Sequence, residues 1–291
     1  MSRLPVDRRD FPDPFVLNTG SGFWAYATNG GGSNVQVLFS EDLARWRSSP
    51  DALPSLPFWA QPGNTWAPCV LPWKGRYLLF YTCREPRAGR QAISVAVADR
   101  PGGPFVDAGT GPLVYQLEMG GSIDPSYIAD IDGSVYLVWK ADANALNRPS
   151  SIWLQRIGPD GTHLVGSPVE LLRLGAAWED PLIEAPSIVW SRGAYYLFYS
   201  ANWWNSDRYA IGYATAPAVA GPYTRVTVTG PWLASDAQVA GPGGQEWFTD
   251  SAGQLRMAYH GWTPGRVGYP KGARSLRLAT VDLTGPEPIV Q

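Results

Sequence analysis

The chain has 291 residues, of which 45% are hydrophobic and 16% are charged, and its formal net charge is −2. This balance argues against nucleic acid or an anionic membrane as a partner, and no apolar run approaches the roughly 20 residues that a membrane span needs. The 32 glycines and 27 prolines favour many short strands joined by tight turns, so we expect an all-β protein with almost no helix.

The amino terminus and the cysteines bear on the compartment. Residues 1–10 lack the apolar segment of a secretory signal. Cys69 and Cys83 are too few for a disulfide framework. A bridge between their two neighbouring strands is one alternative, and a pair of reduced core thiols is the expectation. These features predict a cytoplasmic protein, or a secreted one if a leader has been removed.

A proline opens an apolar run at five places, separated by 54 to 61 residues, namely Pro14, Pro68, Pro125, Pro186 and Pro242. A period of this length indicates a radial or stacked array of structural repeats. After each opening comes an aromatic-rich run, at residues 23–28, 77–82, 135–140, 195–200 and 255–260. Turn residues such as Lys74-Gly75 separate the two runs, which is the pattern of a β-hairpin.

A third run completes each repeat, at residues 35–40, 93–98, 152–157, 210–215 and 276–281. A fourth, outer strand is predicted near Phe105 and at residues 169–174, 223–228 and 288–290, and a single helical turn at residues 41–47. Three or four antiparallel strands repeated five times predict a five-bladed β-propeller that occupies residues 1–291 as one domain. A β-sandwich is the alternative, but it does not explain the near-constant interval.

Three of the five openings carry a carboxylate, in the segments Asp13-Pro14, Asp124-Pro125 and Glu184-Ala185-Pro186. The first strand of each propeller blade lines the central channel, and proline is tolerated at the first residue of a strand. The openings should therefore crowd one mouth of that channel. A single Asp-Pro is usually a turn that caps a backbone donor. Three acids at equivalent positions of the repeats instead predict one pocket shared by Asp13, Asp124 and Glu184.

Paired carboxyl groups in a pocket suit the hydrolysis of glycosides. One of them protonates the leaving oxygen, while the other activates water or attacks the sugar. A third carboxylate nearby would raise the pKa of the acid that must stay protonated, or would orient it by a hydrogen bond.

The segments around these acids resemble those of glycoside hydrolase family 43, five-bladed propeller enzymes that cleave arabinofuranosides and xylosides with inversion. The resemblance is carried by Asp13-Pro14, Trp66-Ala67-Pro68, Ser122-Ile123-Asp124-Pro125-Ser126, Ile183-Glu184-Ala185-Pro186-Ser187 and Tyr259-His260. It implies Asp13 as the general base, Glu184 as the general acid and Asp124 as the group that orients and tunes the acid. It implies no covalent intermediate.

The resemblance also implies residues that bind the substrate. Arg274 is expected to reach from the last blade towards substrate hydroxyls and the base, and a solvent-exposed arginine is its alternative. Trp66 is the first candidate for stacking on a sugar ring, followed by Trp24, Phe58 and Trp203. Blade packing is the alternative for each of these aromatic residues.

One departure from the family concerns the last blade. Many relatives carry a histidine after its Gly-Pro-Gly, whereas here Gly244-Gln245 follows. His260 remains, and in similar enzymes a histidine on this strand faces the central channel near a water-coordinated cation. The resemblance therefore implies a calcium ion held through waters and His260; a buried histidine bonded to the backbone is the alternative. The hydrolysis itself is expected to require no cofactor.

The leading functional hypothesis is an inverting exo-α-L-arabinofuranosidase that acts on arabinan or arabino-oligosaccharides and has no nucleic acid or membrane partner. A β-xylosidase or galactofuranosidase of the same fold is an alternative, because specificity rests on a few hydroxyl contacts in loops. A non-catalytic sugar-binding propeller is a third hypothesis. It ranks lower because none of the three acids has been lost.

Overall fold

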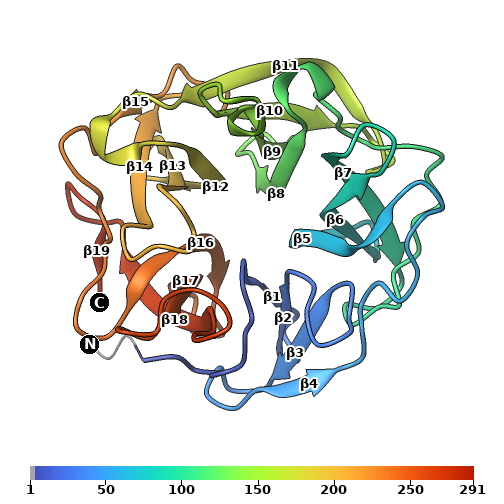
Figure 1. Ribbon diagram of the computed structural model, residues 1–291, viewed down its shortest axis with the longest axis horizontal. Helices are drawn as coiled ribbons and strands as arrows, with labels where there is room; N and C mark the ends of the chain where they lie inside the picture. Colours follow the sequence, from blue (N-terminus) through green and yellow to red (C-terminus); the bar gives the residue numbers. More distant parts are fainter. Residues whose placement is uncertain (1–3) are drawn as a thin grey trace.

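A computed structural model, which describes residues 4–291, has five antiparallel sheets arranged around a central axis (Figure 1). The blades follow one another in chain order, from the blue N-terminal sheet to the red C-terminal sheet, and the first strand of each blade lies innermost. This is the all-β, five-bladed propeller that the repeat predicts.

The strands are named by blade. Blade I comprises β1 (Phe15–Asn18), β2 (Phe23–Ala27), β3 (Gln36–Ser40) and β4 (Arg47–Ser49), and blade II comprises β5 (Gln61–Trp73), β6 (Arg76–Glu85) and β7 (Arg90–Ala98). Blade III comprises β8 (Ser122–Ala129), β9 (Val135–Ala141), β10 (Ser151–Ile157) and β11 (Leu164–Arg173). Blade IV comprises β12 (Ile183–Ser191), β13 (Ala194–Ala201), β14 (Ala210–Ala216) and β15 (Thr224–Arg225). Blade V comprises β16 (Ala240–Thr249), β17 (Leu255–Trp262), β18 (Ser275–Asp282) and β19 (Ile289–Val290). Short 3-10 helices, η1 (Leu117–Met119), η2 (Ala143–Leu146) and η3 (Ala177–Glu179), lie in the connections.

The segment that precedes β1 closes the ring against the last blade. The backbone N–H of Val6 donates to the carbonyl of Leu276, and that of Phe11 donates to the carbonyl of Arg274, both at 2.9 Å. Blade I is thereby joined to β18 of blade V. This closure brings Asp13, near the start of the chain, beside residues close to its end.

The tight turns that the sequence predicts have the backbone conformation their residues favour. Lys74-Gly75 and Arg192-Gly193 both have positive φ at both residues, at 49° and 81° and at 52° and 77°. Positive φ at both central positions is the type I′ turn, whose twist matches that of the flanking strands. The first two strands of blades II and IV are therefore hairpins, as expected.

The outermost strands differ from the prediction at two places. The sequence predicts a helical turn at residues 41–47, whereas Asp42 accepts hydrogen bonds from the backbone N–H groups of Ala44 and Arg45 and the chain then enters β4. The expectation of a helical turn was wrong because an aspartate side chain competes for those donors. Near Phe105 the predicted strand is reduced to one bridge between Val97 and Val106.

A left-handed residue precedes the repeated proline of every blade. Pro14 lies directly before β1, but in blades II to V the proline lies inside the inner strand, so the expectation that it is the first residue of each strand was wrong for those four blades. The φ angles are 54°, 42°, 55°, 47° and 57° for Asp13, Ala67, Asp124, Ala185 and Gly241. In blades II to V the pairing of the inner strand with its neighbour is interrupted at this point. Such irregularities re-aim side chains and are concentrated at functional sites. In blade IV this position belongs to Ala185, so Glu184 lies one residue earlier than the equivalence of the three acids predicts.

The interior of the blades is packed with apolar side chains from the strands. The largest cluster joins blades I, II and III and contains Tyr26, Phe80, Tyr81 and Trp139. Cys69 and Cys83 are buried and unbonded, as expected for core thiols. Within residues 4–291 there is no helix long and apolar enough to cross a membrane.

Candidate active site

The three acids singled out by the sequence meet in one cavity. Asp13, Asp124 and Glu184 all line a space of about 340 Å³ at the centre of the ring. Asp13 lies two residues before β1, Asp124 in β8 and Glu184 in β12, so three blades each contribute one carboxylate. The prediction that distant openings converge is confirmed at the level of the fold.

Asp13 is held beside two cationic or polar partners. Thr28 donates its hydroxyl to Asp13 Oδ2 at 2.6 Å, and Arg274 Nη1 lies 3.6 Å from Oδ1. Burial alone would raise the pKa of Asp13, but Arg274 above all, then His260 and the Thr28 hydrogen bond, act against burial and leave the pKa below its usual value. The carboxylate is therefore ionised at neutral pH, which is the state that a general base requires.

Asp124 faces the general-acid candidate. Its Oδ2 accepts a hydrogen bond of 2.9 Å from the backbone N–H of Ala185, and its own N–H donates to Thr82 Oγ1 at 3.1 Å. Burial raises the pKa of Asp124 well above its usual range, and the neighbouring Glu184 carboxylate raises it further.

Glu184 is buried in the cavity wall and accepts a hydrogen bond at each oxygen. Tyr209 donates its hydroxyl to Oε1 at 2.8 Å, and Lys140 donates from Nζ to Oε2 at 3.0 Å. Tyr209 is itself fully buried, which places Oε1 against the protein. Oε2 lies on the side of Lys140, a residue that itself lines the cavity of the acids.

The aromatic residues proposed for sugar stacking divide into two groups. Trp66 and Trp203 line the cavity that holds the acids. Trp24 does not: it pairs with Phe39 across blade I, the rings meet edge to face at 4.9 Å, and it lines a separate cavity with residues 100–104. Phe58 lies in a connection, is 85% exposed and does not line the cavity of the acids. The expectation for Trp24 overlooked its packing on the neighbouring strand.

Arg274 reaches the cavity, and its guanidinium lies 4.5 Å above the ring of Trp204, which was not predicted. Lys140, Asp142 and Asn144 also line the cavity and were missed. A lysine inside the apolar run at residues 135–141 was the available signal, because a buried lysine needs an anionic partner.

The geometry of His260 bears on the predicted calcium ion. The backbone N–H of Asp13 donates to His260 Nδ1 at 3.0 Å, and burial lowers the pKa of the imidazole to about 3. The ring is therefore neutral with its proton on Nε2, which leaves no lone pair for a metal. Residues 4–291 contain no group of three or more metal-ligating side chains. Direct ligation of a cation by His260 is therefore disfavoured, and the backbone contact with Asp13 matches the alternative of a buried histidine. Nε2 is buried without a hydrogen-bond partner among residues 4–291, and a calcium ion that reaches it only through a water stays a prediction.

The cavity that opens between the acids along the axis is small. Asp13, Asp124 and Glu246 line it together with the opening prolines, and its volume is about 20 Å³. That is room for about one water molecule.

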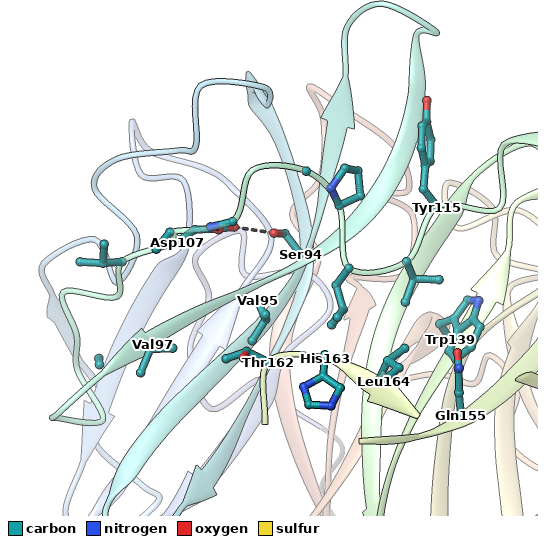
Figure 2. A pocket seen from close by; sticks show the side chains of 18 of the residues that line it. Ser94, Val95, Val97, Asp107, Tyr115, Trp139, Gln155, Thr162, His163 and Leu164 are labelled. Carbon is teal, nitrogen blue, oxygen red and sulfur yellow. Dashed lines mark hydrogen bonds between the residues drawn. The ribbon is translucent and has the colours of Figure 1, made fainter. Parts of the chain in front are cut away.

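A much larger groove lies elsewhere, between blades II and III (Figure 2). Its volume is about 1110 Å³, and its walls include Tyr115, Trp139 and His163. Asp107, at one end of the view, accepts hydrogen bonds from Ser94 and from the hydroxyl of Tyr81. None of the three converging acids lines this groove, so cavity size alone would misplace the site.

Comparisons with known proteins agree with this geometry. The model of the glycosyl hydrolases family 43 matches residues 2–285. The extracellular exo-α-(1→5)-L-arabinofuranosidase of Cellvibrio japonicus is 27% identical over 238 residues, which are 74% of this chain and 66% of that protein. The probable arabinan endo-1,5-α-L-arabinosidase D of Emericella nidulans is 32% identical over 138 residues, 43% of this chain and 35% of that protein.

Among solved structures, a thermostable family-43 glycoside hydrolase is 27% identical and superposes with a TM-score of 0.86, over 97% of this chain and 92% of that one. The alignments with the two curated relatives thus span about a third and just under two thirds of those proteins' lengths.

Proposed function

This chain belongs to glycosyl hydrolases family 43 and is a glycoside hydrolase, and on that premise we propose that it is an inverting, exo-acting α-L-arabinofuranosidase. It would release α-L-arabinofuranosyl residues from the ends of arabinan or arabino-oligosaccharides. One observation carries the proposal: Asp13, Asp124 and Glu184, from three different blades, line a single cavity with Arg274 and three tryptophans.

The mechanism follows from the surroundings of the two working acids. Glu184 donates a proton to the glycosidic oxygen as the bond between that oxygen and the anomeric carbon breaks. Asp13, kept ionised by Arg274 and Thr28, accepts a proton from a water molecule whose oxygen attacks the opposite face of the sugar. The sugar leaves with inverted configuration. Glu184 is then a carboxylate and Asp13 a carboxylic acid, and exchange with solvent restores both.

Asp124 serves this reaction through its position. It binds the backbone N–H of Ala185, next to Glu184, and its buried carboxyl group has a raised pKa, because two charges side by side in this cavity are disfavoured. A proton is thereby kept in the pair and is available to Glu184 before each turnover. Asp124 itself neither gives nor takes the reacting proton in this scheme.

The size and lining of the cavity support attack on a chain end. A volume of about 340 Å³ lies near the lower end of the roughly 300–1,000 Å³ found for ligand pockets, which suits one terminal sugar better than a long chain. Trp66, Trp203 and Trp204 offer flat apolar faces to the ring. The Cellvibrio japonicus relative is named as an exo-acting enzyme, whereas the Emericella nidulans relative is named as endo-acting.

Two further expectations accompany the proposal. The reaction scheme uses two carboxyl groups and water, so it requires no cofactor. Dialysis against EDTA should leave kcat/KM unchanged, and a loss restored by Ca²⁺ would overturn this expectation. The cytoplasmic location stays a prediction, which fractionation of the source cells would test.

The test of the substrate assignment is a product-identified screen. Purified protein is incubated with p-nitrophenyl α-L-arabinofuranoside, β-D-xylopyranoside and β-D-galactofuranoside, and with linear arabinan, and products are identified by chromatography. The proposal expects nitrophenol release from the arabinofuranoside at the highest kcat/KM and arabinose as the first product from arabinan. Preference for the xyloside or galactofuranoside, or first products longer than arabinose, would contradict it. Binding without turnover would favour the sugar-binding propeller.

A further inference from the structure

Lys140 is a charged residue of the active-site wall to which the reaction scheme assigns no role. It lies in β9, its side chain is 1% exposed, and its Nζ is 3.0 Å from Glu184 Oε2 and 3.0 Å from Asp142 Oδ1. It lines the same cavity as the three acids. A lysine this deeply buried needs anionic partners, and this one has two within contact distance.

Lys140 stays protonated throughout the catalytic cycle. Burial alone would lower the pKa of Lys140, but Glu184, then Asp142 and Asp124 outweigh burial and raise the pKa above its usual value. These three carboxylates come from β12, from the end of β9 and from β8, and they are the groups that set the charge around Nζ. Lys140 therefore acts as a fixed positive charge and does not transfer a proton.

The position of this charge conflicts with the acid role of Glu184. The hydroxyl of Tyr209 occupies Oε1 on the buried side, so the proton delivered to substrate must sit on Oε2. Lys140 donates a hydrogen bond to that same oxygen. The ammonium group and the catalytic proton thus compete for one atom, and Glu184 cannot donate from Oε2 while Lys140 is bound there.

Asp142 resolves the competition. Its carboxylate is in contact with Nζ at the same distance as Glu184, and its side chain is 15% exposed, so it is in partial contact with solvent. Lys140 can therefore release Glu184 and keep one anionic partner without moving far. The exchange leaves no buried charge unpaired, which is the condition for it to be energetically accessible.

We propose that Lys140 is a positioning residue that holds Glu184 as an oriented carboxylate between turnovers and shifts to Asp142 when Glu184 takes up its proton. This inference rests on the proposed function, because it assumes that Glu184 is the general acid. The proton comes from solvent, binds Oε2, and passes to the leaving oxygen as the glycosidic bond breaks. Lys140 keeps its three protons before and after the step.

Replacing Lys140 and replacing its partner Asp142 should shift the pH profile of kcat/KM in opposite directions. An ammonium group beside a carboxylate favours its charged form, by about 1–3 pH units for a close pair. The substitution Lys140→Met should therefore move the basic limb of the profile up by about that amount. Asp142→Asn leaves Lys140 with Glu184 as its main partner and should move the same limb down by about one unit. A purely structural role would lower the plateau of both variants and move neither limb.

A second measurement needs no substrate. Wild-type protein labelled with ¹³C at the glutamate carboxyl carbon is titrated by NMR, and the Glu184 resonance is assigned by its loss in Glu184→Gln. The midpoint of this titration should rise in Lys140→Met and fall in Asp142→Asn. If the wild-type protein hydrolyses no glycoside, the proposed function fails while this titration still decides the role of Lys140.

The outcomes are separable. Opposite shifts in the two variants support the inference, and an unmoved midpoint or shifts of the same sign overturn it. If Lys140→Met does not fold, as judged by its circular dichroism melting curve, the near-isosteric Asp142→Asn carries the test alone. An unchanged or raised midpoint in Asp142→Asn then overturns the inference.

Discussion

The carboxylate of Asp124 accepts a hydrogen bond of 2.9 Å from the backbone N–H of Ala185, the residue that follows Glu184. This bond crosses from blade III to blade IV. It joins the acid that tunes the site to the chain segment that carries the proton donor. Because Ala185 has a left-handed backbone, its N–H is turned away from the ladder of its own blade and is free to make this contact.

Replacing Asp124 should change the pH profile as well as the rate. Asp124→Asn keeps the shape and an acceptor for the Ala185 N–H but removes a carboxyl group that, once the pH exceeds its raised pKa and it ionises, disfavours ionised Glu184. The basic limb of the kcat/KM profile should move to lower pH. Asp124→Ala should lose more activity than Asp124→Asn, because it also removes the hydrogen bond. A basic limb at the wild-type pH in Asp124→Asn would contradict the tuning role.

Substrates with different leaving groups should distinguish the role of Asp13 from that of Glu184. Asp13→Asn should lower kcat by about 10²–10⁴ on every substrate, because activation of water is always needed. Glu184→Gln should lose a similar factor on arabinan but less on aryl arabinofuranosides, whose phenolate leaves without protonation. Kinetics on substituted phenyl arabinofuranosides would measure this. Equal losses for both variants on all leaving groups would contradict the assignment.

Arg274 should control the acidic limb of the profile. It holds the pKa of Asp13 below its usual value, so its removal should raise that pKa. The base then takes up a proton at higher pH, and the acidic limb of kcat/KM moves up in Arg274→Met. The exposed Arg266 lies in the same connection, and Arg266→Met serves as the control, with no movement expected. An unmoved acidic limb in Arg274→Met would show that Asp13 is not the base.

Gly244 occupies a place that no side chain can share. Its φ is 60°, and a Cβ there would lie 2.6 Å from His260 Nδ1 and 3.1 Å from Asp13 Oδ1. Gly244→Ala should therefore destabilise the protein by about 1–3 kcal/mol and displace the base. Gly253 has a φ of 78° and open space around its Cβ position, so Gly253→Ala isolates the backbone cost of about 1 kcal/mol or less. In urea unfolding, the midpoint of Gly244→Ala should be lower than that of Gly253→Ala. Similar midpoints would contradict the predicted clash of a Cβ at position 244 with His260 and Asp13.

The neutral state of His260 should make stability depend on pH. Burial lowers the pKa of His260 to about 3, whereas an unfolded histidine has a pKa near 6.5. Between these values the unfolded chain binds a proton that the native state does not, so stability falls as the pH drops from about 6.5 to 3. His260→Asn should flatten this dependence in urea unfolding. His163, 51% exposed, provides the control in His163→Asn, where an equal flattening would contradict the account.

Much of the fold could be read from the sequence because its cause is local. A proline that cannot donate to a strand ladder marks each inner strand, before β1 in blade I and at the interruption of pairing in blades II to V. Glycines after residues such as Lys74 mark the hairpins. The convergence of Asp13 and Asp124 follows from their equivalent positions, directly before the repeated proline of their blades. The offset of Glu184 does not, because the left-handed bulge at Ala185 decides which of two neighbouring side chains enters the cavity.

The missed parts of the site depend on contacts between blades. Lys140 and Glu184 are 44 positions apart, and their contact arises only when blades III and IV pack together. Trp204 enters the cavity beneath Arg274 from a connection with no strand pattern. Trp24 was assigned to the site although its partner Phe39 lies on the adjacent strand. The periodicity of the sequence does not predict which face of a blade is covered by its neighbouring blade.

The most direct test of the account is the anomeric configuration of the first product. Wild-type protein is mixed with p-nitrophenyl α-L-arabinofuranoside, and the anomeric protons are followed by ¹H NMR from the first seconds, with Glu184→Gln as the control for background hydrolysis. An acid and a base acting through water on opposite faces predict β-L-arabinofuranose before mutarotation. Initial release of the α anomer, or no hydrolysis above the Glu184→Gln background, would contradict the roles given to Asp13 and Glu184.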